Sequence, residues 1–253
     1  MTVTSLPRRT LLVETALVLG VSLGASAVWS VLSIIRKATA EVSLSAQTTA
    51  MNSSVTPDRP WLDLAYQLAG IALALVPVVL ALHLLRRDDP HPARSMGLDV
   101  SRPLPDAVLG VALTAVIGIP GLALYVLGRE LGMNTTVAAA NLADVWWAVP
   151  VLILAAVQNA VLEEVVMVGY LFRRWTQAGW GMWQVIVTSA IIRGTYHLYQ
   201  GFGAFVGNAV MGVVFGWLYT RTRRVMPLVV AHALLDIVAF VGYALLRDRL
   251  TWL

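Results

Sequence analysis

The stretch WWAVPVLILAAVQNAVLEEVVMVGYLF, residues 146–172, decides how this chain folds. It is apolar over more than the roughly 20 residues that a helix needs to cross a bilayer. Two adjacent carboxylates, Glu163 and Glu164, nevertheless lie within it. An ionisable side chain in a membrane helix is costly, so it usually faces the interior of a helical bundle and marks function. The stretch therefore predicts a membrane-spanning helix that carries part of a functional site.

The composition of the whole chain agrees with a membrane protein. Of its 253 residues, 58% are hydrophobic and 13% are charged, whereas about a quarter of the residues of a soluble domain are charged. The chain contains no cysteine, which excludes a disulfide framework and a thiolate metal site. A metal site in this protein would need histidine and carboxylate ligands.

Seven apolar segments are long enough, or nearly long enough, to span a bilayer. Backbone groups in lipid must be satisfied within their own segment, and no segment has the alternating pattern of a barrel strand, so we expect helices. The sequence predicts an all-α, polytopic membrane bundle of about seven transmembrane helices. The segments are Leu11–Ile35, Leu64–Leu85, Ala107–Leu127, Trp146–Phe172, Met182–Tyr199, Phe205–Tyr219 and Pro227–Leu246.

The basic residues predict an orientation. If the N-terminus is cytoplasmic, eleven arginines fall inside and six basic residues outside, as the positive-inside rule favours. We therefore expect an integral protein of a bacterial-type plasma membrane, with its N-terminus in the cytoplasm and its C-terminus outside. The pI near 9.8 suits an anionic lipid surface and does not indicate nucleic acid. The inside set is Arg8, Arg9, Arg86, Arg87, Arg94, Arg102, Arg173, Arg174, Arg221, Arg223 and Arg224; the outside set is Arg36, Lys37, Arg59, Arg129, Arg247 and Arg249.

The first apolar segment also has features of a secretory signal. Arg8 and Arg9 precede it, and the small residues Ala38, Thr39 and Ala40 follow it. The apolar core of a signal is typically about 7–15 residues long, and this segment is much longer. We interpret it as a retained anchor.

Ionisable side chains recur in two later apolar segments at helical spacing. Arg193 and His197 are four residues apart, as are His232 and Asp236, so each pair lies on one face of its helix. Alone, each has a structural explanation: a histidine can link two helices, Asp236 can orient His232, and Arg193 can be a counter-ion for a glutamate. Together with the two glutamates, these residues favour a common functional site.

The two glutamates cannot play the same role, because neighbouring residues are about 100° apart around a helix. A carboxylate beside two imidazoles in a dry cavity can activate water for hydrolysis, with Glu as the general base and His as the oxyanion stabiliser. The HExxH pattern of zinc proteases is absent. A divalent metal such as zinc, held by His197, His232 and Glu163, is chemically possible, but these positions alone do not establish it.

In order and spacing these residues resemble the CAAX-processing and bacteriocin-processing (CPBP, or abortive-infection) family of intramembrane proteases. The motifs of that family read EExxxR, FxxxH, and HxxxN or HxxxD. They align here with EEVVMVG at residues 163–169, RGTYH at residues 193–197 and HALLD at residues 232–236. The resemblance covers roughly residues 146–246. We therefore divide the chain into an N-terminal transmembrane region with three spans, residues 1–145, and a CPBP-like catalytic helical core, residues 146–253.

The resemblance implies an intramembrane endopeptidase that cleaves a membrane-associated protein or peptide. Members of the family have been described both as metalloproteases and as metal-independent glutamate proteases. By this resemblance Glu163 is the water-activating base, His197 assists it and Glu164 is a supporting carboxylate. His232 and Asp236 would stabilise the oxyanion.

Two residues depart from the motifs of the family. Val168 replaces the motif arginine, and Arg193 replaces the motif phenylalanine. Our hypothesis is that the cation has moved from the fourth segment to the fifth, where Arg193 pairs with Glu164. Asp236 also needs explanation, because an ionised carboxylate only accepts hydrogen bonds. It could instead hold His232 in one tautomer.

Two other functions and one geometric difficulty stay open. The chain could be a proteolytically inactive relative that acts as a membrane scaffold or immunity protein. It could also be a small proton-coupled transporter with Glu163 and His197 as a relay, although it lacks the repeats and broken helix pairs of transporters. Counting about 1.5 Å per residue places Glu163 and His232 in the inner half of the membrane, and His197 nearer the outer end of its helix. Helix tilt would be needed to bring them together.

Overall fold

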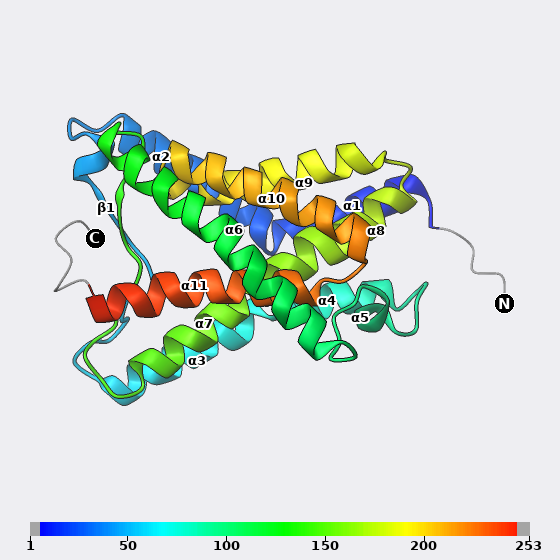
Figure 1. Ribbon diagram of the computed structural model, residues 1–253, viewed down its shortest axis with the longest axis horizontal. Coiled ribbons are helices and arrows are strands. Elements are labelled where there is room, and N and C mark those ends of the chain that lie inside the picture. Colours follow the sequence, from blue (N-terminus) through cyan, green and yellow to red (C-terminus); the bar gives the residue numbers. More distant parts are fainter. Residues whose placement is uncertain (1–5, 247–253) are drawn as a thin grey trace.

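The computed structural model describes residues 6–246, and most of their regular structure is helical (Figure 1). The predicted all-α, polytopic membrane bundle is confirmed. The end of the second predicted region, residues 247–253, lies outside the described residues, as do Arg247 and Arg249.

The longer helices are α1 (Arg8–Gly20), α2 (Leu23–Ala38), α3 (Pro60–Ala74), α4 (Val76–Leu85), α6 (Pro103–Glu130), α7 (Ala148–Glu163), α9 (Met182–His197), α10 (Phe202–Thr222) and α11 (Met226–Leu246). The shorter elements are η1 (Leu44–Ala46), α5 (Pro92–Ser95), the π-helix η2 (Glu164–Tyr170), α8 (Leu171–Gln177), η3 (Leu198–Gln200) and the strands β1 (Thr48–Ala50) and β2 (Thr136–Ala138).

Five helical segments within residues 6–246 are long and apolar enough to cross a membrane, where the sequence predicts about seven. The first predicted span consists of α1 and α2, which are bent by 57° and make a sixth span if the pair is counted as one. The fifth predicted span is α9, which has only 16 residues. At 1.5 Å per residue it is about 24 Å long, less than the hydrocarbon thickness of about 30 Å. The five segments are Pro60–Leu85, Pro103–Glu130, Ala148–Gln177, Phe202–Thr222 and Met226–Leu246.

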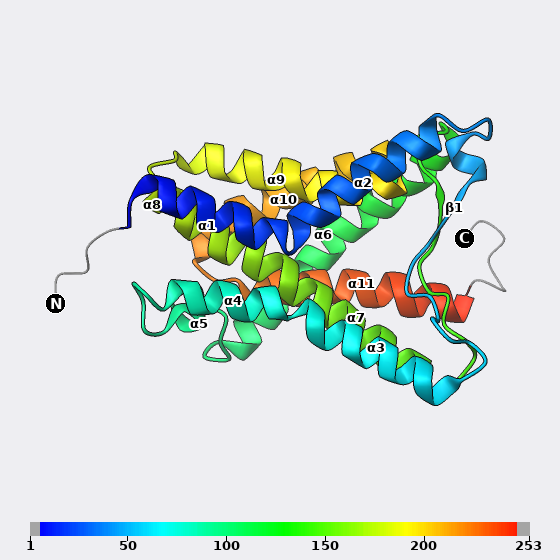
Figure 2. The ribbon, with the colours of Figure 1, turned by 180° about the vertical axis from the view of Figure 1, so that it is seen from behind.

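The two ends of the bundle differ in charge. The start of α1 lies at the same end as α5, α8 and the last turns of α4 and α10, whereas α11 ends at the opposite end (Figures 1 and 2). The arginines that the sequence assigns to the cytoplasmic side all lie in or next to the elements at the first end. Within residues 6–246, the bundle thus separates the two predicted sets of basic residues. Which end faces the cytoplasm remains a prediction.

At the opposite end a small parallel sheet joins two connecting loops. Strand β1 pairs with β2 in the register Thr48 to Thr136. Beneath this sheet the buried Lys37, near the end of α2, donates hydrogen bonds to the Thr49 hydroxyl and to the Tyr199 carbonyl, the latter at 2.7 Å. These bonds fix α2 against η3, which directly follows the helix that carries Arg193 and His197.

The turn between η3 and α10 depends on glycine. Gly201 has φ +128°, a backbone conformation that L-residues rarely adopt, and an added Cβ would lie 2.5 Å from the Asn134 Cα atom. Asn134 in turn accepts a hydrogen bond from the Gly203 backbone N–H at 2.9 Å through its side chain, within the first turn of α10. The loop before β2 therefore holds the point where α9 ends and α10 begins.

The start of α11 is held to the start of α6 by one arginine. Arg224 Nη2 lies 2.7 Å from Asp106 Oδ2 and 3.0 Å from Asp99 Oδ1. Hydrogen bonds from the Ser101 side chain and backbone, and from Arg224, lower the pKa of Asp99 to about 2. The bonds to the two carboxylates raise the pKa of Arg224, so the guanidinium stays charged. These contacts position the helix that carries His232.

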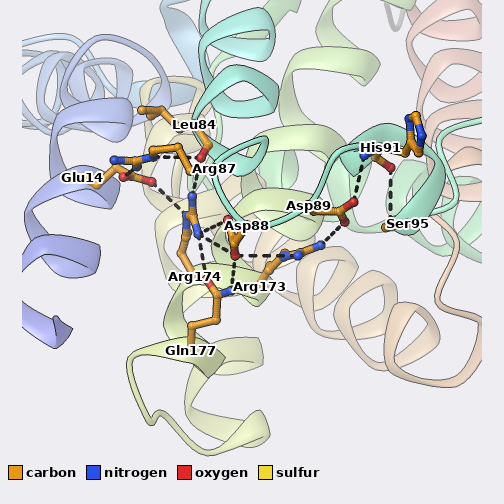
Figure 3. Close-up of polar contacts among 10 residues, drawn as sticks. All are labelled: Glu14, Leu84, Arg87, Asp88, Asp89, His91, Ser95, Arg173, Arg174 and Gln177. Atoms are coloured by element: carbon orange, nitrogen blue, oxygen red, sulfur yellow. Dashed lines mark hydrogen bonds and ion pairs between the residues drawn. The ribbon is translucent and has the colours of Figure 1, made fainter. Parts of the chain in front are cut away.

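A second ionic cluster joins the N-terminal helix to α8. Figure 3 shows the Arg174 side chain between Glu14 of α1 and Asp88, just after α4. Arg174 is fully buried; its Nε lies 2.9 Å from Glu14 Oε1 and its Nη1 3.0 Å from Asp88 Oδ1. Its Nη2 donates to the Leu84 carbonyl at 2.6 Å, and Tyr170 of η2 also donates to Glu14 at 2.9 Å. Arg174 therefore fixes one end of the segment that carries the two glutamates.

We expect Arg174→Ala to destabilise the protein by about 1–3 kcal/mol, because it removes the buried guanidinium that bridges Glu14 and Asp88 and leaves Glu14 paired only with the more exposed Arg87. The neighbouring Arg173 is the matched control. It pairs with Asp89 and Asp88 but keeps 29% of its side chain exposed, so Arg173→Ala should cost at most about 1 kcal/mol. Thermal unfolding of the detergent-solubilised variants measures both effects. Equal losses of stability in the two variants would show that the buried ion pairs of Arg174 contribute no more to stability than the partly exposed ion pairs of Arg173.

Candidate active site

The two glutamates lie where α7 changes into a π-helix. α7 ends at Glu163, and the next seven residues, Glu164–Tyr170, form η2, every residue of which is buried. π-helical turns are rare and occur frequently at functional sites. A neighbouring helix compensates for the disturbed backbone pairing, since Ser189 of α9 donates a hydrogen bond to the Met167 carbonyl at 2.8 Å. The apolar periodicity of the sequence gave no indication of this change in helix type.

Glu164 is fully buried and bound by two side chains from other helices. Its Oε1 lies 2.8 Å from Arg193 Nη2 of α9 and 2.7 Å from His232 Nδ1 of α11, and its Oε2 accepts from Arg193 Nη2 at 2.9 Å. The pairing of Arg193 with Glu164 is the one that the sequence hypothesis predicts. Because an ionised carboxylate only accepts hydrogen bonds, we assign a proton to His232 Nδ1, which faces Glu164. Glu164 thus orients both the guanidinium and the imidazole.

Glu163 is in a different environment. Its Oε2 accepts a hydrogen bond from the Tyr196 hydroxyl at 2.6 Å. Arg193 Nη1 lies 3.6 Å from the same oxygen and His232 Nε2 lies 4.0 Å from it. The side chain of Glu163 keeps 11% of its surface exposed, whereas that of Glu164 keeps none. Glu163 therefore adjoins two positively charged or ionisable groups without being fully enclosed by them.

Asp236 contacts this cluster less closely than the spacing suggests. Its Oδ1 lies 3.8 Å from His232 Nε2, beyond hydrogen-bond distance, and its Oδ2 accepts from Asn159 at 3.4 Å. The predicted role of Asp236 in fixing the His232 tautomer is therefore not supported, because Glu164 binds Nδ1 directly. The i, i+4 spacing correctly places His232 and Asp236 on one face of α11. It cannot predict that a carboxylate from another helix, Glu164, binds the His232 ring.

Within residues 6–246, His197 has no hydrogen bond to Glu163 or Glu164, although it lies close enough to Glu163 and His232 to interact with their charges. Its Nδ1 is 3.2 Å from the Arg193 carbonyl, one turn back on α9, and its ring is 4.8 Å from that of Tyr196. The neighbouring Tyr196 is the α9 side chain that reaches Glu163. The tyrosine lies within the second motif, RGTYH, but the motif predicts no role for it. Its spacing could have indicated one: Tyr196 is three residues after Arg193 and so lies on the same helical face as the residue that binds Glu164.

Three side chains of the site could together approach a metal ion. Among residues 6–246, Glu163, Glu164 and His232 have potential ligand atoms within 4.8 Å of one another, and His197 is not in that group. The Arg193 guanidinium, however, lies 2.8 Å from Glu164 and 3.6 Å from Glu163. A divalent cation bound about 2 Å from these oxygens would adjoin that fixed positive charge. We infer that this set of side chains does not fit a divalent metal.

The part of the chain that holds the candidate site is similar to a known protein family. Residues 145–238 match the family model described as type II CAAX prenyl endopeptidase Rce1-like. The matched segment contains all three motifs and ends just after Asp236, so the family predicted from those motifs is confirmed for this region. No curated protein and no solved structure matches the chain. With its apolar helices, the chain is an integral membrane protein with a CAAX-protease-like region.

Proposed function

We propose that this protein is an intramembrane endopeptidase that hydrolyses a peptide bond of a membrane-associated protein or peptide with a water activated by Glu163. The observation that carries the proposal is the division of roles between the glutamates. Glu164 is neutralised by Arg193 and His232, while Glu163, one residue earlier, is less enclosed. The match of residues 145–238 to a CAAX endopeptidase family supports the same reaction class.

The geometry supports a role for each group. Glu163 Oε2 is engaged by Tyr196, so its other oxygen, Oε1, accepts the proton of the attacking water and later returns it to the leaving amine. His232 is bound to Glu164 through Nδ1, which leaves Nε2 directed to the side where Glu163 and Asp236 lie. In its protonated form, Nε2–H donates to the oxygen of the tetrahedral intermediate. His197 remains a candidate for assisting Glu163 or binding substrate.

This reaction needs no metal. Arg193 already supplies the positive charge that a metal would bring to the glutamates, at 2.8 Å from Glu164 and 3.6 Å from Glu163. We also propose the orientation that the basic residues favour, with the N-terminus in the cytoplasm. The site would then act on chains embedded in, or lying against, the bilayer.

The test is hydrolysis in isotopically labelled water. Purified protein in lipid nanodiscs is incubated, in H2¹⁸O, with membranes from cells that lack it, and new peptide C-termini are identified by mass spectrometry. We expect a small set of new C-termini carrying ¹⁸O with the wild-type protein and none with Glu163→Gln. The same termini in both samples, or none in either, would contradict the proposal.

The same assay tests the absence of a metal. With an excess of a zinc chelator, we expect cleavage to stay within about twofold of the untreated value. Purified protein should contain far less than one equivalent of transition metal per chain. A chelator-induced loss that added zinc restores would leave the protease assignment standing and contradict the metal-independent reaction.

A further inference from the structure

Tyr196 donates the shortest hydrogen bond to either glutamate. Its hydroxyl lies 2.6 Å from Glu163 Oε2, and its side chain is buried, with 5% exposed. A carboxylate only accepts hydrogen bonds when ionised, so the phenol is the donor. A short bond from a neutral hydroxyl to a charged oxygen is stronger than one between two neutral groups. This contact therefore restricts the rotation of the Glu163 carboxylate about its last side-chain bond.

The tyrosine is itself held in place from several sides. Its ring lies 4.8 Å from that of His197, and α9 is held against η2 by the hydrogen bond from Ser189 to Met167. The end of α9 is further fixed by the bond from Lys37 to the Tyr199 carbonyl. A hydroxyl on such a constrained helix can fix the orientation of a flexible glutamate side chain.

One face of α9 supplies a donor to each glutamate. Arg193 binds Glu164, and Tyr196, three residues later, binds Glu163. The charged donor neutralises the enclosed carboxylate, whereas the neutral donor leaves the charge of the other carboxylate in place. This is what a general base requires, since a fully neutralised carboxylate attracts a proton poorly.

We propose that Tyr196 is a positioning residue for the reaction: it engages Glu163 Oε2 so that Oε1 faces the attacking water. The inference rests on the proposed function, because it assigns a role to a residue that supports the base. The proposed role concerns how the Glu163 carboxylate is oriented, and it leaves the assignment of Glu163 as the general base unchanged.

The test compares Tyr196→Phe with Tyr199→Phe, using a peptide cleavage identified in the labelled-water assay. Tyr199 is the matched control: it is three residues further along, and its hydroxyl contacts Gln200 and not a glutamate. We expect Tyr196→Phe to lower kcat by about 10- to 100-fold while KM changes by less than about twofold, as misorientation of a catalytic group does. Tyr199→Phe should leave both constants within about twofold of wild type.

A double variant separates positioning from a general structural effect. If Tyr196 acts only through Glu163, adding Tyr196→Phe to Glu163→Gln should cause no further loss of the residual rate. A melting temperature of Tyr196→Phe close to that of wild type is also expected. If that variant does not fold, 3-fluorotyrosine at position 196, which keeps the ring and makes the hydroxyl more acidic, should change kcat and leave KM unchanged.

The outcomes distinguish this inference from the proposed function. If wild type cleaves, Glu163→Gln does not, and Tyr196→Phe matches wild type, Tyr196 has no positioning role and the protease assignment stands. An equal effect of Tyr196→Phe and Tyr199→Phe, or an unchanged kcat with fluorotyrosine, overturns the inference in the same way. If wild-type protein cleaves nothing, both fail.

Discussion

Glu163→Gln should abolish turnover and leave the protein folded, with a loss of about 10²- to 10⁴-fold, the range that a general base contributes. The substitution keeps the size of the side chain and an oxygen that can accept the Tyr196 hydrogen bond, but glutamine cannot take a proton from water. Cleavage rate and thermal unfolding of the purified protein measure the two parts of this expectation. The melting temperature should change by only a few degrees.

Glu164→Gln is the control and should behave in the opposite way. Glu164 is fully buried and is the closer carboxylate to Arg193, so removing its charge leaves the guanidinium only the longer, 3.6 Å contact with Glu163. We expect a loss of about 3–5 kcal/mol in the free energy of unfolding. Any activity of the fraction that folds should exceed that of Glu163→Gln. If Glu164→Gln stays stable and is the inactive variant, the roles of the two glutamates are reversed.

Arg193→Phe should be inactive and unstable, and adding Val168→Arg should rescue it. The single change restores the phenylalanine of the family's second motif but leaves Glu164 buried without its cation. Val168 is buried in η2, four residues after Glu164, and so lies about one turn from it. A guanidinium at position 168 can therefore reach Glu164. A phenylalanine at position 193 would pack near the Phe215 ring, over which the Arg193 guanidinium now lies at 5.6 Å.

The rescue is measured by the cleavage rate and by the melting temperature. We expect the double variant to recover at least about a tenth of the wild-type rate and most of the 3–5 kcal/mol that the single variant loses. Val168→Arg alone places a second cation near Arg193 and should be destabilising. A double variant no better than Arg193→Phe would show that the charge did not move between the two helices.

The apolar segments predicted most of the helices because length and polarity alone decide whether a segment can cross a bilayer. They did not predict the bend between α1 and α2, nor that α9 would be short. Met182–Tyr199 is an apolar segment, but its last residues form η3, where Lys37 binds the Tyr199 carbonyl. Such ends depend on side chains from distant parts of the chain.

The sequence predicted the candidate site only in part, because contacts between helices depend on side chains from distant parts of the chain. Charge complementarity in an apolar interior was enough to pair Arg193 with Glu164, since neither could be buried alone. Helical periodicity gives the face of a residue but not its depth relative to other helices. It therefore did not predict that Tyr196 is the α9 side chain that donates a hydrogen bond to Glu163, and the role of His197 stays a prediction. A tyrosine in an apolar helix is common, and nothing in its own sequence context distinguishes a donor to Glu163 from a packing residue.

The assignment of Glu163 as the water-activating base is the central element of the proposed function. The most direct measurement is a proteomic comparison of membrane and secreted fractions from cells that carry wild-type protein or Glu163→Gln at equal expression. We expect at least one membrane-linked fragment to disappear in the variant while its uncleaved precursor accumulates. Identical peptide profiles from the two strains would contradict it.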